Sequence, residues 1–245
     1  IILRQQNFLR RWREKTMAKY QKIQTLFLRD DKNIIILDQF TYPEFEYLKD
    51  NKWECTEKID GTNIRIELDF YVHDDGTREV NVNFKGRTDE ANIPEHLYRR
   101  LEELFDNVNW FEIFNITGTT SITLYGEGYG TKIQKGGNYI SSGVDFILFD
   151  VKVDKWWLQR DAVEDIANKL NIKIVPLIGY MTIPEAVEYV KKGFKSTIAE
   201  NKDYDAEGLV LKTTTGLLRR NGERLITKIK TVDFRKYRDS QVMKS

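Results

Sequence analysis

Lys58 has the neighbours that a covalent lysine nucleophile needs. Asp60 and Gly61 follow it, and residues 53–68 alternate polar and apolar side chains, a pattern that predicts two strands joined by a tight turn. An amine attacks only after it loses its proton, so burial or neighbouring cations must favour the neutral form. Because an isolated Lys-x-Asp-Gly run is more often a solvated lysine beside a turn, this chemistry needs support from the rest of the chain.

Four other segments place charged groups at the ends of expected strands. Glu127 lies between two glycines, which let a ligand approach the backbone closely, and Glu207 opens an apolar strand. Residues 146–150 (Phe-Ile-Leu-Phe-Asp) put an aromatic side chain next to an acid. Lys228 and Lys230 share one face of a strand, because side chains alternate with a period of two. Each segment alone has an ordinary explanation as a turn, a core strand or a solvated face, but their joint occurrence indicates one site.

The composition excludes several other kinds of site. With 39 basic and 38 acidic residues among 245, the formal charge is +1, so nucleic-acid binding has to rest on local patches. The single cysteine, Cys55, excludes an internal disulfide and a cysteine-based zinc site and suits a reducing compartment. The isolated histidines His73 and His96 exclude an HExxH zinc site. No apolar run reaches transmembrane length and no signal-peptide pattern opens the chain, so we expect a cytoplasmic protein without membrane contact.

The elements that must position these residues follow an α+β pattern. Short strands joined by turns make up most of it, and the last two, at residues 206–213 and 224–231, are expected to form a hairpin. We therefore expect antiparallel β-sheets with inserted helices in one domain, residues 17–245. Residues 1–16, rich in arginine, are predicted to be a basic N-terminal extension.

Three helices are predicted from their N-terminal signals. Asn92 is expected to cap the first of them. The pairs Asp161 with Glu164 and Thr182 with Glu185 have the spacing of a capping box, in which each side chain accepts a hydrogen bond from the backbone N–H of the other residue. Two helices should therefore begin at Asp161 and Thr182.

In chain order, the charged segments resemble the motifs of the covalent nucleotidyltransferase superfamily, which comprises DNA ligases, RNA ligases and mRNA capping enzymes. The matching stretches are residues 58–61, 86–87, 125–128, 146–151, 207–212 and 228–230. Asn63 distinguishes the branches: Lys-x-Asp-Gly-x-Asn is similar to ATP-dependent RNA ligases of the RNA ligase 2-like branch, whereas DNA ligases and capping enzymes generally carry arginine there. Residues 126–137 look most like phage and bacterial RNA ligase-domain proteins. The resemblance implies an ATP-grasp-like nucleotidyltransferase (adenylation) domain.

The resemblance also implies a reaction in three steps. Lys58 attacks the α-phosphate of ATP to give lysyl-AMP, AMP passes to a 5′-phosphate on RNA, and a 3′-hydroxyl then seals the strand and releases AMP. Lys228 and Lys230 would contact the α-phosphate, where positive charge is needed. Glu207 would hold Mg²⁺ or Mn²⁺, which are hard cations that bind oxygen ligands.

The remaining motif residues are implied to hold the nucleotide. Glu127 would accept a hydrogen bond from the ribose, and Phe149 would stack on the adenine, with Phe146 as the alternative. Asn63 and Arg87 would bind the ribose or the phosphates. The further candidates for nucleotide binding are Glu57, Lys212 and Asp60, the last mainly as the residue that fixes the turn.

Only fifteen residues follow Lys230, so we expect neither an OB-fold nor the C-terminal domain of larger RNA ligases. The expected partners are nicked or single-stranded RNA ends, and the expected state is a monomer in a bacterial or phage-infected cell. The alternatives are a minimal ATP-dependent DNA ligase and a nucleotide- or RNA-binding module without turnover. A capping guanylyltransferase is a weaker alternative.

Overall fold

The chain folds as an α+β protein with mainly antiparallel sheets, as predicted. The structure, a computed structural model, describes residues 19–134 and 138–235, so the basic extension expected at residues 1–16 lies outside the described residues. Two compact units can be distinguished. Among the described residues, the first unit comprises residues 19–20, 61–134 and 142–174, and the second comprises residues 21–60, 138–141 and 175–235.

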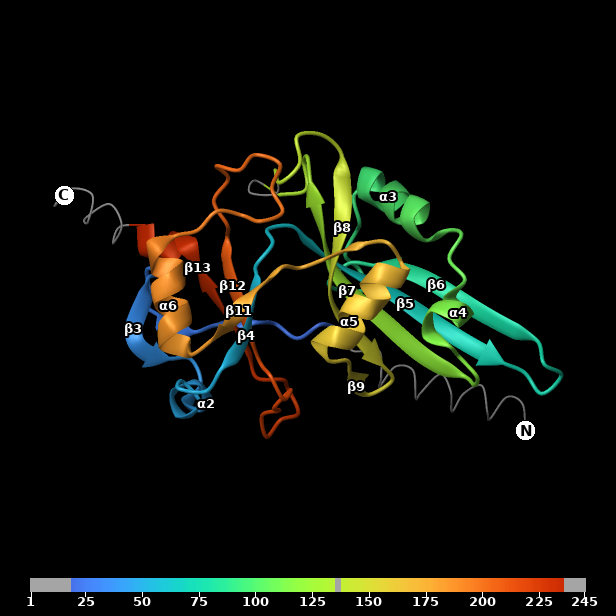
Figure 1. Cartoon of the computed structure of the whole chain (residues 1–245), viewed down its shortest axis with the longest axis horizontal. Coiled ribbons are helices and arrows are strands. Elements are labelled where there is room, and N and C mark those ends of the chain that lie inside the picture. The colour runs from blue at the N-terminus through green and yellow to red at the C-terminus, as the bar shows by residue number, and fades with distance from the viewer. Residues whose placement is uncertain (1–18, 135–137, 236–245) are drawn as a thin grey trace. The chain divides into compact units, whose positions relative to one another are not determined.

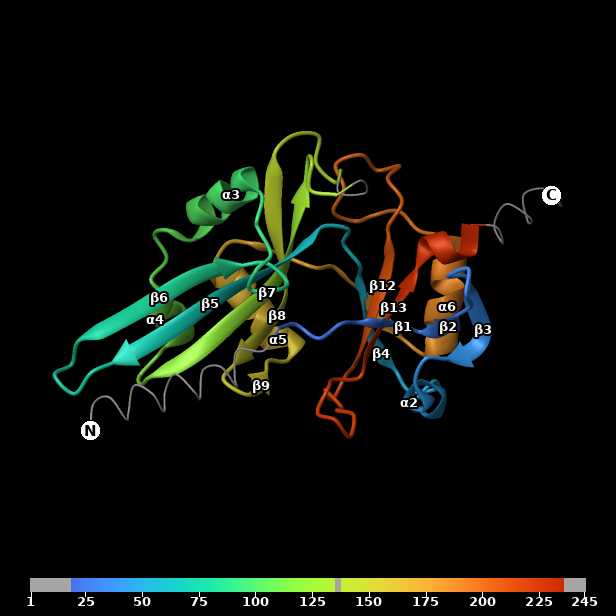
Figure 2. The same cartoon turned by 180° about the vertical axis from the view of Figure 1, so that it is seen from behind.

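The first unit is built on one large sheet, whose main strands run in the order β10-β8-β7-β5-β6, with β9 paired to β8 (Figure 1). The strands are β5 (Thr62–Val72), β6 (Arg78–Lys85), β7 (Thr120–Gly130), β8 (Val144–Val153), β9 (Trp156–Trp157) and β10 (Lys173–Ile174). The helices of this unit are α3 (Glu95–Phe105), α4 (Trp110–Phe114) and α5 (Arg160–Lys169). Helices α4 and α5 lie in front of the sheet in Figure 1 and behind it in Figure 2.

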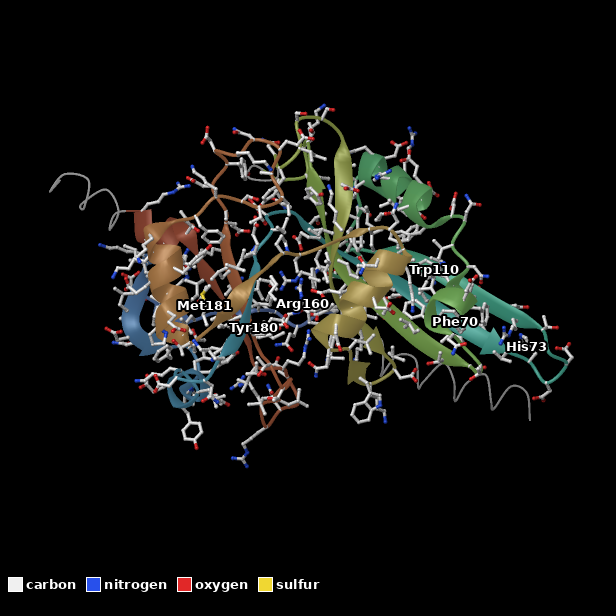
Figure 3. All side chains as sticks on the ribbon, in the orientation of Figure 1. Phe70, His73, Trp110, Arg160, Tyr180 and Met181 are labelled. Atoms are coloured by element: carbon white, nitrogen blue, oxygen red, sulfur yellow. The ribbon has the colours of Figure 1, made fainter. Side chains whose placement is uncertain are left out.

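Alternate residues of β5 form the centre of the first core. Ile64, Ile66 and Leu68 are fully buried and pack with apolar residues of all three helices, because a strand presents every second side chain to the same face. Phe70 of β5 and Trp110 of α4 belong to the same cluster, and both are labelled in Figure 3.

Strands β5 and β6 are joined by a tight turn, in which the N–H of Gly76 donates to the carbonyl of His73 at 3.0 Å. His73 lies at the tip of this hairpin in Figure 3, and its side chain is about half exposed. This histidine is therefore a solvated turn residue.

The second unit contains a five-stranded sheet in the order β1-β13-β12-β4-β11 and a separate β2–β3 pair. Its strands are β1 (Gln24–Thr25), β2 (Phe27–Arg29), β3 (Ile35–Phe40), β4 (Trp53–Glu57), β11 (Leu177–Met181), β12 (Gly208–Thr213) and β13 (Ile226–Lys230). Its helical segments are α2 (Pro43–Tyr47), α6 (Ile183–Lys192) and the 3₁₀ turn Thr231–Phe234. Apolar residues of α6 pack with Trp53 and Cys55 of β4 and with Leu209 and Leu211 of β12. The expected C-terminal hairpin is confirmed as β12 and β13.

The expected hairpin around the Asp60-Gly61 turn is wrong. Strand β4 pairs with β11 and β12, whereas β5 pairs with β6 and β7, so the two strands belong to different sheets. Asp60 is the last residue of its segment in the second unit, and Gly61 begins the next segment of the first. A Cβ at Gly61 would clash with the carbonyl oxygen of Gly128, so glycine is required here by close packing on β7.

Among the residues that the structure describes, no helix has the length and apolar character needed to cross a membrane.

Candidate active site

The nucleophile candidate lies where β4 ends. The backbone N–H of Lys58 donates to the carbonyl of Gly208 at 2.9 Å, which extends the β4–β12 pairing by one residue. The Lys58 ammonium lies 2.5 Å from Oε2 of Glu207 and 3.3 Å from the carbonyl oxygen of Ile59. Its side chain is only 19% exposed, so the amine is held in a partly buried position.

Glu207 forms ion pairs with two of the lysines predicted to lie at the site, Lys58 and Lys230. Its Oε1 atom lies 2.8 Å from Nζ of Lys230, while its Oε2 atom holds Lys58. The backbone of Glu207 is also fixed, because its carbonyl accepts from the N–H of Thr231 at 2.8 Å. One carboxylate therefore bridges two ammonium groups that are far apart in the sequence.

The strand register shows which candidates share a face with this cluster. Lys228 pairs with Val210, which pairs in turn with Thr56 of β4, and Lys230 lies two residues beyond Lys228. Because side chains alternate, Lys228 and Lys230 lie on one face of β13, as predicted. Lys212 lies towards the other end of β12, about 13 Å along the strand from Gly208.

Glu57 is placed differently from the expected nucleotide contact. It shares the core face of β4 with Trp53 and Cys55, and only 1% of the residue is exposed. Its carboxylate accepts hydrogen bonds from Ser196 Oγ at 2.5 Å, from the Thr197 N–H at 2.9 Å and from Thr197 Oγ1 at 2.7 Å. Glu57 therefore holds residues 196–197 against the end of β4. No sequence pattern pairs a carboxylate with hydroxyl groups about 140 residues away.

Asp60 lies in the segment between the two sheets, and its backbone N–H donates to the hydroxyl oxygen of Tyr139 at 2.8 Å. No motif in the sequence singles out Tyr139. Only its position in the glycine-rich connection between β7 and β8 could have drawn attention to it.

In the first unit, Asn63 and Glu127 lie directly opposite each other on β5 and β7. The Oδ1 atom of Asn63 is buried and has no hydrogen-bond partner among the described residues. A buried acceptor without a donor is costly, so this atom is suited to accept a hydrogen bond from a ligand.

The glycines that flank Glu127 serve the core rather than a ligand. A Cβ at Gly126 would clash with the ring of Phe146, and a Cβ at Gly128 would clash with Leu97 of α3. This result differs from the expected role in letting a ligand approach the backbone. It also places Phe146 in the core, where its ring packs against Phe105 with the centroids 5.8 Å apart.

Phe149, the preferred candidate for stacking, is only partly buried and lies outside the core cluster. Its ring makes an edge-to-face contact with Tyr20 at 5.0 Å between centroids. Tyr20 also donates a hydrogen bond to Asp150 at 2.5 Å. Phe149 and Asp150, which are adjacent on β8, therefore both contact Tyr20.

Arg87 is exposed in the loop that follows β6, and a buried arginine holds this loop. Arg65 of β5 pairs with Glu67 at 3.0 Å and with Asp89 at 2.6 Å, and its Nε donates to the carbonyl of Gly86 at 2.9 Å. The hydrogen bond from Arg65 lowers the pKa of Asp89. No pattern in the sequence singles out Arg65, because β5 alternates polar and apolar residues and Arg65 is one of several charged residues in it.

Comparison with known proteins finds a family match and several similar solved structures. The sequence model of the RNA ligase family matches residues 51–230. A Naegleria gruberi RNA ligase with pyrophosphate is 20% identical, with a TM-score of 0.55, over 91% of this chain and 59% of that one. A mutant of that ligase with ATP and manganese is 19% identical, with a TM-score of 0.55, over 92% and 58%. A further mutant with AMP and manganese is 21% identical, with a TM-score of 0.54, over 91% and 63%.

The chain thus spans less than two thirds of the length of these solved structures. At this level of identity, the likeness establishes a shared fold. The family match covers well over half of the chain. The matched residues include Lys58, Glu207 and both lysines of β13. The chain belongs to the RNA ligase family.

Proposed function

We propose that this protein is an ATP-dependent RNA ligase that joins 5′-phosphate and 3′-hydroxyl RNA ends through a lysyl-AMP intermediate on Lys58. The observation that carries the proposal is the Lys58–Glu207–Lys230 cluster, with distances of 2.5 and 2.8 Å, in a chain that belongs to the RNA ligase family. The solved Naegleria RNA ligases with ATP, AMP, pyrophosphate and manganese support the same choice of substrate and metal.

In the first step, the neutral amine of Lys58 forms a bond to the α-phosphorus of ATP. The bond from that phosphorus to the bridging oxygen breaks, and pyrophosphate leaves with the electron pair. Glu207 is within hydrogen-bonding distance of the amine and is placed to accept its proton. Lys230 and Lys228 provide positive charge on one strand face, where they would stabilise the charge that develops on the α-phosphate.

The second and third steps transfer the AMP group. A 5′-phosphate oxygen of RNA attacks the phosphorus of lysyl-AMP, and the Lys58 amine leaves. A 3′-hydroxyl oxygen then attacks the 5′-phosphorus, and AMP leaves with the electron pair. The same cations would serve each step, because negative charge develops on phosphate oxygens in all three.

Residues of the first unit would contribute to nucleotide binding. The unpaired Oδ1 of Asn63 would accept a hydrogen bond from a ribose hydroxyl, and the neighbouring Glu127 could accept a second one. Phe149 would stack on the adenine, because Phe146 is committed to the core. Arg87, exposed on its loop, would contact phosphate.

Glu207 is the carboxylate that would hold a divalent ion. No group of three or more His, Cys, Asp or Glu side chains suitable for a metal gathers within the described part of the chain. The other ligands would therefore be phosphate oxygens and water, which is the usual environment of Mg²⁺ beside a nucleotide. When bound, the ion would neutralise charge on the phosphates of ATP.

We further propose that residues 17–245 act as an adenylation domain, in monomeric form, in the cytoplasm of a bacterial or phage-infected cell. The single buried cysteine supports a reducing compartment. Size-exclusion chromatography with light scattering tests the monomeric state, and a mass near twice 29.0 kDa would contradict it.

Lys58→Ala and Lys58→Met test the proposed nucleophile. The protein is incubated with α-labelled ATP and Mg²⁺ or Mn²⁺, and acid-labile label on the protein is measured. The wild-type protein should become labelled, and both variants should lose the label completely, because they lack the attacking nitrogen.

Lys191→Ala is the matched control. Lys191 lies on α6, where it pairs with Glu188 at 2.9 Å, so its removal should leave labelling unchanged. Label retained by a Lys58 variant would overturn the assignment, and an unlabelled wild-type protein would overturn the proposed function.

A further inference from the structure

Residues 139–141, in the connection between β7 and β8, contact the loop at residues 200–204, which belongs to the same unit. The carbonyl of Tyr139 accepts from the N–H of Glu200 at 2.8 Å, and the carboxylate of Glu200 accepts from the N–H of Ser141 at 2.7 Å. The ring of Tyr139 packs against the ring of Tyr204, with the centroids 5.0 Å apart. Tyr139 is 1% exposed, so these contacts hold the ring in one place.

The hydroxyl of this fixed ring reaches the segment that carries the nucleophile. Its oxygen accepts a hydrogen bond from the backbone N–H of Asp60 at 2.8 Å. Burial raises the pKa of the Tyr139 phenol, so the group stays neutral around neutral pH.

The backbone around Lys58 is therefore held on both sides. Before the lysine, β4 is paired with β12, and the Lys58 N–H itself bonds to Gly208. After the lysine, the chain leaves the sheet, and the bond from Asp60 to Tyr139 fixes it there.

We infer that Tyr139 is a positioning residue for the nucleophile: its hydroxyl fixes the backbone after Lys58 and so sets where the amine lies relative to Glu207. This inference rests on the proposed function, since it concerns the step in which Lys58 attacks ATP. Reaction rates are very sensitive to placement, and an error of about 1 Å can cost about 100-fold. Tyr139 would act on the rate of lysyl-AMP formation without touching ATP.

Tyr139→Phe removes the hydroxyl and keeps the ring. Single-turnover formation of lysyl-AMP at saturating ATP is expected to fall at least tenfold, which corresponds to about 1.4 kcal/mol in the barrier. The ATP concentration that gives half the maximal rate should stay within about twofold of the wild-type value. The reason is that the Tyr139 hydroxyl bonds to the backbone N–H of Asp60 and is not proposed to contact ATP. Sealing of an RNA that already carries AMP on its 5′ end should also stay within about twofold, because that step has no lysine nucleophile.

Tyr204→Phe is the matched control. It makes the same chemical change in the same aromatic pair but leaves the acceptor for Asp60 in place, so lysyl-AMP formation should stay within about twofold of wild type. Equal losses in the two variants would overturn the inference. So would a Tyr139→Phe protein that loses sealing of the adenylylated RNA as well, since a general folding defect would then explain the loss.

Hydrogen exchange tests the bond without any activity. The Asp60 amide should exchange at least tenfold faster in Tyr139→Phe than in wild type and should be unchanged in Tyr204→Phe. An unchanged amide in Tyr139→Phe would overturn the inference even if the wild-type protein forms lysyl-AMP. Wild-type protein that forms no lysyl-AMP would instead overturn the proposed function.

Discussion

At the scale of single residues, the central feature is one carboxylate shared by two lysines. Glu207 places one oxygen on Lys58 and the other on Lys230, and all three side chains are partly buried. Partial burial makes such interactions stronger than they are on an open surface. In the proposed mechanism, the charge of Glu207 would therefore act directly on the amine of Lys58.

Replacing this charge tests its role. Glu207→Gln keeps the size of the side chain but removes the negative charge, so it can neither accept the lysine proton nor hold a metal well. We expect lysyl-AMP formation to fall about 100-fold or more, the magnitude typical of a lost electrostatic group in an active site. The rate at saturating ATP and Mn²⁺ is the measurement, with thermal unfolding measured alongside.

Asp205→Asn is the control for this substitution. Asp205 lies two residues away, is exposed, and pairs with Lys195 outside the cluster at 2.8 Å, so its rate should match wild type. A Glu207→Gln enzyme with near-normal adenylylation would remove Glu207 from the mechanism.

At the scale of elements, β4 fixes the position of the proposed nucleophile, Lys58. It pairs on both sides, with β11 and with β12, and its apolar residues face the second core. Cys55 lies in the middle of this strand, is fully buried, and is the only cysteine of the chain, so its thiol reports on the opening of β4.

Burial raises the pKa of the Cys55 thiol to about 12, which leaves almost no reactive thiolate near neutral pH. We expect iodoacetamide at pH 8 to label the native protein at least about 100-fold more slowly than the urea-unfolded protein. Raising the pH from about 9 towards 12 should lower the free energy of unfolding, because the unfolded chain releases this proton before the folded one does. Native labelling at the unfolded rate would show that β4 opens readily.

The N-termini of the helices show which of the predicted capping signals the structure contains. The Thr182–Glu185 capping box at α6 is confirmed by both of its hydrogen bonds. The other two predicted starts are wrong: Pro94 occupies the N-cap position of α3, and α5 begins at Arg160. Glu164 pairs there with Arg160 at 2.7 Å, so an ion pair one turn apart replaces the expected capping box.

At the scale of the whole molecule, opposite charges almost cancel, and the formal charge is +1. Attraction to RNA therefore has to come from local cations such as Arg87 and Lys230. Contacts of this kind are mostly made to phosphate, and each one releases counterions, so binding weakens as salt is added.

We predict that RNA nicks are sealed faster than matched DNA nicks, especially when ribose lies on the 3′-hydroxyl side. Raising salt from about 50 to 200 mM should slow sealing at limiting RNA about tenfold or more, as expected for a few phosphate contacts. Matched RNA and DNA nicks, assayed in parallel at both salt concentrations, provide the measurement. Faster sealing of all-DNA nicks, or rates indifferent to salt, would contradict the preference for RNA.

Local patterns were enough to predict the α+β class, the last hairpin and the shared face of Lys228 and Lys230. These features depend on side-chain alternation and turn chemistry, which act over a few residues and can be read directly from neighbours in the chain. Lys58 and Glu207 were predicted to share a site from the resemblance of the ordered motifs to a known superfamily, and the structure places their side chains 2.5 Å apart.

Only the tertiary structure decided how the segment after Lys58 runs and what holds it. The alternation in residues 53–68 is the same whether two strands pair with each other or with strands elsewhere, and here they pair elsewhere. The hydrogen bonds of Glu57 with Thr197 and of Asp60 with Tyr139 join residues 140 and 79 positions apart. Such contacts form because packing brings distant segments together, and no short-range pattern in the sequence specifies them.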